Sequence, residues 1–272
     1  MRNDGRTPEV ITKKYLGQNF LVDQKMISRI VDACELSLEE SVLEIGPGQG
    51  ALTQAILPLV KSVVAVETDR VLANTLQNEY ADRNLKVYHA DFLKFDLHQL
   101  EQPIKIVGNI PYNISTPILT KVIDSRHLIS RVFMTIQFEF GARLIARPGT
   151  KDYSSLSCLM QMFTVPKILF KIPPQAFRPV PRVMSCLLKI DVRKEPAEPL
   201  TDELLFARVV RLAFFQRRKN LLNALSALYP SGKDKVGLLL EKSGISPRAR
   251  AEELTITQYA RITNVYAQDL LS

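Results

Sequence analysis

The chain has 272 residues, of which 46% are hydrophobic, and a formal net charge of +8. This composition excludes an intrinsically disordered protein, and the length suffices for one large domain with a buried core plus a smaller second domain. The three cysteines form no CxxC pair, which argues against a disulfide framework and a zinc site, so no metal is expected.

Strands and helices alternate along the first two thirds of the chain. A basic N-terminal lead, residues 1–22, precedes an amphipathic helix predicted for 23–36. Five apolar strands separated by helices follow, with strands at 41–45, 62–66, 85–90, 104–107 and 131–136 and helices at 51–60, 70–80 and 116–123. This alternation predicts an α/β fold with a doubly wound, mostly parallel, Rossmann-like sheet.

The pattern changes after residue 190. Two more helices and two late strands complete the sheet region, in the order 137–147, 153–163, 167–172 and 183–190. Residues 191–201 form a polar linker with prolines, and the pattern beyond it is helical throughout. We therefore predict a domain of residues 1–195 and a small all-helical C-terminal domain of residues 202–272.

No apolar run approaches the ~20 residues that a membrane span needs. The first ten residues lack the apolar core of a secretory signal peptide. We therefore expect a cytoplasmic protein with no membrane partner.

Four of the predicted strands end in a glycine or a polar residue, namely Gly46, Glu67, Asp91 and Asn109. Ligands of doubly wound sheets bind at the carboxyl ends of the strands. One acid at a strand end usually marks only a turn. Several neighbouring strands that all end in a polar residue or glycine are harder to explain as turns alone. They therefore predict a ligand-binding site at this edge of the sheet.

A glycine-rich turn, EIGPGQG, links the first of these strands to the next helix. Gly46 and Gly48 let the backbone lie against a ligand without a Cβ clash. Glu67 is placed to accept hydrogen bonds from both ribose hydroxyls of an adenosine. Asp91 and Phe92 could bind an adenine amine and cover a ring face. Together these residues predict a nucleotide-like ligand.

The same turn also satisfies the NAD fingerprint GxGxx(G/A), at Gly46, Gly48 and Ala51, which makes a dehydrogenase an alternative. Two observations count against it. Pro47 and Gly50 crowd the turn more than a diphosphate loop requires, and no His-Asp or Tyr-Lys pair for hydride transfer follows. The histidines, in contexts typical of surface or strand-edge positions, are His89, His98 and His127.

The motif GNIPY follows the fourth strand. Pro111 has a fixed φ and no N–H, so it holds neighbouring carbonyl groups outward. Asn109 and the carbonyl before Pro111 could grip the hydrogens of an aromatic amine and return its lone pair to nitrogen, while Tyr112 offers a flat face for a base. An ordinary X-Pro turn with a packing tyrosine is the structural alternative. After the fourth strand of this fold, the motif indicates amino methylation.

The chain resembles the KsgA/RsmA-type small-subunit ribosomal RNA adenine dimethyltransferases along nearly its whole length. Several long motifs occur in the family's order, which argues against coincidence. The matching segments are KYLGQNFL at 14–21, EIGPGQGALT at 44–53, GNIPYNISTPIL at 108–119, PPQAFRPVPRVMS at 173–185, FFQRRKNLLNAL at 214–225 and SGISPRARAEELTITQYARI at 243–262.

The resemblance implies a Rossmann-like methyltransferase fold and an S-adenosyl-L-methionine-dependent enzyme. Its reaction would give N6,N6-dimethyladenosine at two adjacent adenosines in a hairpin loop near the 3′ end of 16S rRNA. By the family's pattern, Asn19 and Leu21 would close over the cofactor and Gly46 would lie against its methionine portion. Glu67 would hold the ribose and Asp91 the adenine.

The resemblance also assigns residues to the target base. Asn109 would contact the target amine, and Tyr112 and Phe177 would sandwich the base. From the residues alone, Phe177 is equally well explained as a loop residue buried under the prolines. Among the departures from the family's pattern, Phe138 stands where a lysine is usual, followed by Phe140-Gly141 where Val-Ala is common, and Ile110 replaces the commoner leucine.

Ten Lys or Arg residues against two acids fall within residues 205–250, and the densest cluster contains Arg217, Arg218 and Lys219. Such a run is often only a solvated face. Its confinement to one predicted domain favours contact with RNA phosphates. We expect a monomer that binds 16S rRNA within a small-subunit ribosomal particle.

Two alternatives remain within the same fold. One is a 23S rRNA adenine methyltransferase of the resistance type, whose motif shares Ile110. The other is a non-catalytic assembly factor that binds RNA or DNA. The retained Glu67, Asp91 and Asn109 favour catalysis, and the C-terminal motifs favour the small-subunit branch.

Overall fold

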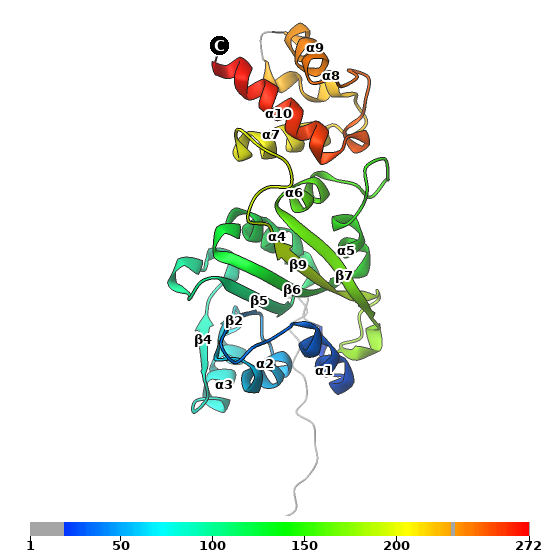
Figure 1. The fold of residues 1–272 in the computed structure, drawn as a ribbon. Coiled ribbons are helices and arrows are strands. Elements are labelled where there is room, and N and C mark those ends of the chain that lie inside the picture. Colours follow the sequence, from blue (N-terminus) through cyan, green and yellow to red (C-terminus); the bar gives the residue numbers. More distant parts are fainter. Residues whose placement is uncertain (1–18, 230–231, 272) are drawn as a thin grey trace, which may run out of the picture.

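The computed structural model describes residues 19–229 and 232–271. Its centre is a seven-stranded sheet with strand order β4-β3-β2-β5-β6-β9-β7 (Figure 1). The strands of this sheet are β2 (Ser41–Ile45), β3 (Ser62–Glu67), β4 (Leu85–His89), β5 (Ile104–Asn109), β6 (Ile129–Gln137), β7 (Thr164–Ile172) and β9 (Ser185–Val192). The five strands from β4 to β6 are parallel, which confirms the predicted fold class. The late strands β9 and β7 add an antiparallel edge to it.

Helices cover both faces of the sheet. They are α1 (Gln24–Ala33), α2 (Ala51–Ile56), α3 (Arg70–Glu79), α4 (Ser115–Asp124), α5 (Phe138–Leu144) and α6 (Ser155–Phe163). The predicted helix 51–60 ends early and continues as a 3-10 turn at Leu57–Leu59, which contains Pro58. Proline removes a helix hydrogen bond and so favours this break. Among the described residues, no helix is long and apolar enough to cross a membrane.

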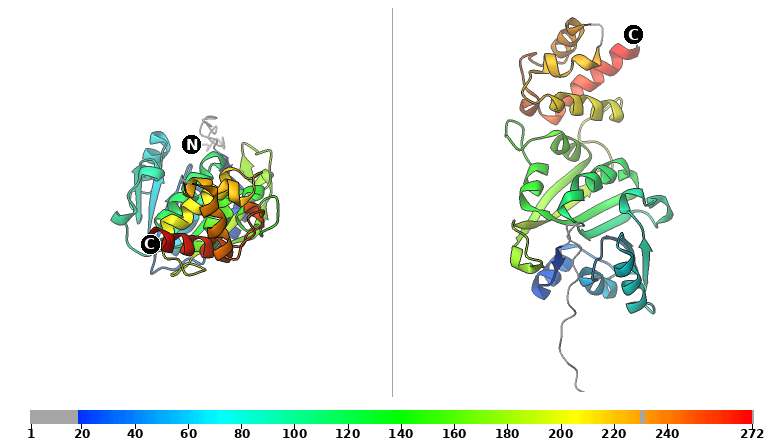
Figure 2. Two further views of the ribbon diagram at one scale, coloured as in Figure 1. Left: turned by 90° about the horizontal axis from the view of Figure 1, so that it is seen from above. Right: turned by 180° about the vertical axis from the view of Figure 1, so that it is seen from behind.

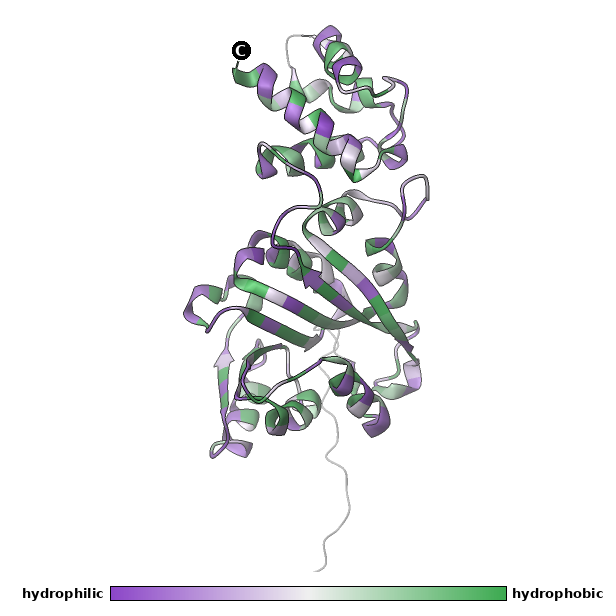
Figure 3. Ribbon diagram, viewed as in Figure 1, coloured by the Kyte–Doolittle hydropathy of each residue, from purple (hydrophilic) through white to green (hydrophobic). Residues whose placement is uncertain are grey.

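Side chains that alternate between the two faces of the sheet form two apolar cores, one on each face. Val42 and Val107 pack with α1 and α2, whereas their neighbours Leu43 and Ile106 pack with α4 and α6 on the other face. Successive side chains of a strand point to opposite faces, so strands covered on both sides are hydrophobic throughout. Figure 3 shows these hydrophobic strands at the centre of the molecule.

The C-terminal helices gather at one end of the molecule (Figures 1 and 2). They are α7 (Glu203–Phe215), α8 (Leu221–Ala224), α9 (Lys233–Lys242) and α10 (Ile256–Leu271). The described part of this region forms no strand of three or more residues, as the helical pattern predicts. One apolar cluster runs from the sheet through α6 into α7 and α10, so the core is continuous across the linker.

A two-stranded antiparallel ladder lies outside the main sheet, and the sequence did not indicate it. It pairs β1 (Phe20–Leu21) with β8 (Phe177–Arg178), with Leu21 opposite Phe177. The backbone N–H of Val22 also donates to the Ala176 carbonyl at 2.8 Å. The end of the predicted N-terminal lead is thereby tied to the proline-rich loop. Residues 1–18 of that lead lie outside the described residues.

Candidate active site

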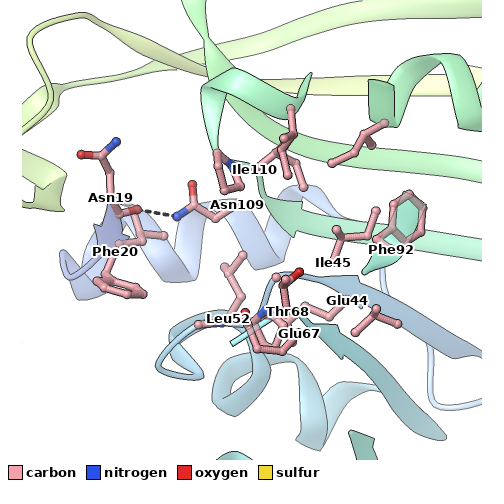
Figure 4. A pocket seen from close by; sticks show the side chains of 18 of the residues that line it. Asn19, Phe20, Glu44, Ile45, Leu52, Glu67, Thr68, Phe92, Asn109 and Ile110 are labelled. Carbon is pink, nitrogen blue, oxygen red and sulfur yellow. Dashed lines mark hydrogen bonds between the residues drawn. The ribbon is translucent and has the colours of Figure 1, made fainter. Parts of the chain in front are cut away.

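A cavity of about 290 Å³ opens at the carboxyl ends of β2, β3 and β5 (Figure 4). Such a volume lies near the lower end of small-molecule sites. The structure brings together every residue predicted to hold the cofactor, and Tyr112 as well. The predicted residues that line the cavity are Asn19, Leu21, Gly46, Gly48, Glu67, Asp91, Phe92, Asn109 and Tyr112.

The glycine turn has the backbone conformation that its sequence requires. Gly46, Gly48 and Gly50 have φ values of +63°, +58° and +82°. L side chains rarely adopt this region. At Gly48 a Cβ atom would also lie 2.8 Å from the Phe20 ring. The turn can therefore approach both a ligand and the N-terminal segment closely.

Glu67 is a buried carboxylate at the end of β3. Its Oε2 accepts a hydrogen bond from the Gly48 N–H at 3.0 Å, and its Oε1 accepts one from the Asp69 N–H at 2.8 Å. Burial raises the pKa of Glu67, while these backbone donors oppose the rise. A carboxylate offers about four acceptor sites, so acceptor capacity remains for hydroxyl groups of a ligand.

Asp91 lies half-buried at the end of β4, where it begins a short 3-10 helix. Its Oδ1 accepts a hydrogen bond from the Leu93 N–H at 2.9 Å, which leaves Oδ2 for a ligand. Phe92 is buried beside it. The Lys121 ammonium donates to the Phe95 carbonyl at 2.5 Å and lies 5.1 Å from the centre of the Phe92 ring. Lys121 thus holds this turn, a contact that the sequence did not reveal.

Asn109, at the end of β5, connects the cavity to the N-terminal segment. Its Nδ2 donates to the Asn19 backbone carbonyl at 2.8 Å (Figure 4). No hydrogen bond to the Asn109 Oδ1 is found among the described residues. An amide nitrogen only donates, so Oδ1 is the atom that can accept from a substrate amine, and the hydrogen bond to Asn19 orients the amide.

Tyr112 follows in the loop after β5. Its hydroxyl group shares a 2.7 Å hydrogen bond with the Ser185 hydroxyl, at the start of β9. Ser185 is fully buried, and burial raises the pKa of Tyr112. Sequence reasoning overlooked Ser185, although it is the last residue of the segment PPQAFRPVPRVMS. The bond ties the Tyr112 ring to the antiparallel edge of the sheet.

Comparison with known proteins identifies the family. The model of the family described as Ribosomal RNA adenine dimethylase matches residues 11–268. The chain is 42% identical over 263 residues to Ribosomal RNA small subunit methyltransferase A of Alkaliphilus metalliredigens, covering 93% of this chain and 91% of that one. It is 40% identical over 270 residues to the protein of the same name from Moorella thermoacetica, covering 95% and 93%. The chain belongs to the ribosomal RNA adenine dimethylase family.

Two solved structures are similar to this one. The 23S rRNA methyltransferase ErmE is 29% identical, with a TM-score of 0.69 over 92% of this chain and 100% of that one. A dimethyladenosine transferase from Plasmodium falciparum, 24% identical with a TM-score of 0.77 over 89% and 95%, shows the same fold. Family membership confirms the predicted enzyme class and rules out the dehydrogenase.

Phe177 does not lie where the family's pattern suggests. Phe177 has no exposed surface and is absent from the cavity wall. Its pairing with Leu21 draws it into the apolar core around α1 and Ala176. In this structure Phe177 packs in the core, outside the cavity wall to which Tyr112 belongs.

The departures from the family's pattern at Ile110 and Phe138 occupy different surroundings. Ile110 is buried and lines the cavity, and its N–H donates to the Thr135 carbonyl at 3.2 Å. Phe138 is half-buried outside the cavity, and the Lys171 ammonium lies 4.1 Å from the centre of its ring. The Phe138 substitution therefore replaces a basic group by an aromatic ring that packs against a cation.

Glu44 is a second buried acid in the cavity wall, which sequence reasoning left unassigned. It is 1% exposed, and its Oε2 accepts a hydrogen bond from the Thr53 hydroxyl at 2.6 Å. Burial, with a smaller contribution from the nearby Glu67 charge, raises the pKa of Glu44 to about 7. The sequence signal was available, because Glu44 is a charged residue within an otherwise apolar strand.

This raised pKa predicts that the enzyme loses stability as pH rises. The unfolded chain releases the Glu44 proton near its ordinary pKa of 4.5, whereas the folded chain retains it to about 7. The contribution is therefore largest below pH 4.5 and is lost as pH rises toward and past 7. We expect a loss of about 2 kcal/mol between pH 5 and pH 7. The free energy of unfolding, measured against pH for the wild type and for Glu44→Gln, isolates this loss.

The exposed residue Glu39 supplies the control, because Glu39→Gln should leave the pH dependence unchanged. If the wild type and Glu44→Gln showed parallel stability curves between pH 5 and pH 7, the Glu44 assignment would be wrong.

Proposed function

We propose that this enzyme transfers methyl groups from S-adenosyl-L-methionine to N6 of two adjacent adenosines in a hairpin loop near the 3′ end of 16S rRNA. The observation that carries the proposal is that Asn109 and Tyr112 line the same cavity as Glu67 and Asp91. One cavity thus combines the residues suited to an adenosine cofactor with those suited to a target amine.

The residues present fit such a cofactor. The remaining acceptor sites of Glu67 suit the two ribose hydroxyls, and the free Oδ2 of Asp91 suits the adenine amine. The positive φ values of Gly46 and Gly48 bring backbone rather than side chain toward the ligand. When bound, the cofactor supplies a methyl group on a positively charged sulfur, which makes transfer to an amine intrinsically favourable.

The chain's own contribution is positioning. The Asn109 Oδ1 accepts a hydrogen bond from the adenine N6 amine and rotates this amine. The lone pair of the amine nitrogen is then no longer delocalised into the ring. The carbonyl of Ile110, held next to Pro111 with its fixed φ of −55°, is the second acceptor. The proton that leaves after transfer passes to water or to a backbone acceptor, so no strong base is required. Orientation of this kind supplies most of the rate enhancement.

Tyr112 provides the stacking surface for the target base, and Ser185 holds its hydroxyl. The adenosine must leave its stack to reach the cavity, which costs less in a hairpin loop than in a duplex. The buried position of Phe177 gives no support for a second stacking ring in this conformation.

The proposed partner is a small-subunit ribosomal particle, and the proposed acting form is a monomer in the cytoplasm, where such particles assemble. The relatives from Alkaliphilus and Moorella carry small-subunit names, which supports 16S over 23S rRNA. Mass spectrometry of rRNA from a deletion strain tests the proposal. Loss of two dimethyladenosines from 16S rRNA is the expected result. A loss confined to 23S rRNA would establish the resistance-type activity instead.

Two of the three basic residues singled out from the sequence are free to contact RNA. Arg218 and Lys219 are exposed, and their side chains make no ion pair with any described residue. Arg217 differs, because its Nη2 donates to the Lys151 carbonyl at 2.5 Å and its Nε lies 3.7 Å from Glu252 Oε2. Arg217 therefore joins the C-terminal helices to the loop before α6.

This difference predicts separable mutant effects. Replacing Arg218 and Lys219 together by alanine should weaken binding to small-subunit particles and reduce the slope of log affinity against log salt by about 1.4–1.8 units. Arg217→Ala should instead lower the melting temperature, with little change in slope. Affinity over a salt series and thermal unfolding of both variants check this. An unchanged slope in the Arg218/Lys219 variant would contradict the phosphate contacts.

A further inference from the structure

The solvent face of α7 carries a stripe of four exposed side chains, which we call the α7 stripe: Leu204, Arg208, Arg211 and Phe215. Their spacings of four, three and four residues place them along one side of the helix. Leu204 and Phe215 are each 84% exposed. The opposite side of α7 is buried against the neighbouring helices, so the stripe is the side left to solvent.

The stripe is positively charged in its middle, where Arg208 and Arg211 lie between the apolar ends Leu204 and Phe215. No hydrogen bond or ion pair with any described residue engages the side chains of Arg208 or Arg211. The sequence holds no acidic residue between 204 and 233. At the other end, Glu203 pairs with Arg126 in the wall of a cavity of about 220 Å³ that Leu204 and Arg211 also line, so that acid is already compensated.

Phe215 is the last residue of α7, three residues before the exposed Arg218 and four before Lys219. It lies outside the apolar cluster that contains its neighbours Ala213 and Phe214. An exposed aromatic ring between arginine side chains matches the chemistry of unpaired RNA. Bases stack on aromatic faces, and guanidinium groups bind the phosphates between them.

We propose that the α7 stripe binds an unpaired segment of the rRNA substrate, with Phe215 stacked on a base and Arg208 and Arg211 on flanking phosphates. This inference rests on the rRNA substrate proposed above and adds a second site, distinct from the methyl-transfer cavity. Phe215 is absent from that cavity wall. The stripe contributes affinity for the particle and takes no part in chemistry.

Binding of the full-length protein to two probes tests the proposal: unmethylated small-subunit particles and single-stranded oligoadenylate. Phe215→Ala should weaken binding to both by about 5- to 150-fold, the range for loss of one stacked base. Phe215→Trp should retain affinity, whereas Phe215→Leu should lose most of it. Leu238→Ala, which removes another exposed apolar side chain in the same region, should have no effect.

The polyanion heparin, which has no bases, separates stacking from charge. Phe215→Ala should leave heparin binding unchanged, and Arg208→Ala with Arg211→Ala should weaken binding to RNA and heparin alike and reduce the salt slope by about 1.4–1.8 units. Equal RNA affinity of the alanine and wild-type proteins, or equal affinity of the leucine and tryptophan variants, would overturn the stacking. Phe215-dependent binding to anionic lipid vesicles without an RNA effect would assign the stripe to a membrane instead.

Methylation by the wild-type protein separates this inference from the proposed function. If the wild type methylates small-subunit particles and Phe215→Ala binds them equally well, only the α7 stripe is refuted. If the wild type leaves 16S rRNA unmethylated, the proposed substrate fails first.

Discussion

Asn109→Ala should reduce single-turnover methylation by at least about a hundredfold while leaving cofactor affinity nearly unchanged. The Asn109 Oδ1 is the amide atom that can accept from the target amine, and the hydrogen bond from Nδ2 to the Asn19 carbonyl at 2.8 Å orients it. Loss of that oxygen misplaces the lone pair at the moment of transfer. Calorimetric cofactor binding and single-turnover methylation of small-subunit particles measure the two effects.

The truncation also releases the Asn19 carbonyl, so controls are needed. Asn109→Asp keeps an oxygen acceptor and loses the donor to Asn19, which separates the two functions of the amide. Asn113→Ala removes an exposed asparagine from the same cavity wall and should have little effect. Near-normal turnover of Asn109→Ala would remove Asn109 from the mechanism.

Glu67→Ala should show the opposite pattern, with cofactor affinity weakened by roughly 1.5–3 kcal/mol, the range for hydrogen bonds to a charged group. Turnover at saturating cofactor should change far less than affinity. The structure adds a second consequence. The N–H groups of Gly48 and Asp69 both donate to this carboxylate, so alanine leaves two buried donors without an acceptor. The variant should therefore also melt at a lower temperature.

Glu67→Gln separates these consequences, because it keeps the side-chain volume and one oxygen acceptor but removes the charge. Thr68→Ala, at an exposed neighbour in the cavity wall, is the matched control and should bind the cofactor normally. If Glu67→Ala bound the cofactor with unchanged affinity at temperatures where the variant is folded, another residue would have to hold the ribose.

The sequence by itself determined the sheet and most of the cavity. Each apolar strand ends at a residue whose chemistry is evident from its type, as for Gly46, Glu67 and Asp91. Parallel strands joined by helices bring their carboxyl ends to one edge, so local spacing is enough to place these residues together. Positions where only glycine fits, such as Gly48, can likewise be recognised from the sequence alone.

The tertiary structure alone decided the contacts that join distant segments. Pairing of Leu21 with Phe177 buries an aromatic ring that motif reasoning placed on the substrate, and the Tyr112–Ser185 hydrogen bond spans 73 residues. Only the tertiary structure likewise decided the antiparallel direction of β9 and the contact of Arg217 with Lys151. A strand pattern specifies which face of a segment is buried but not which distant segment pairs with it. That choice depends on the register and packing of the whole chain, and it separates Arg217, held by the fold, from Arg218 and Lys219, left to the solvent.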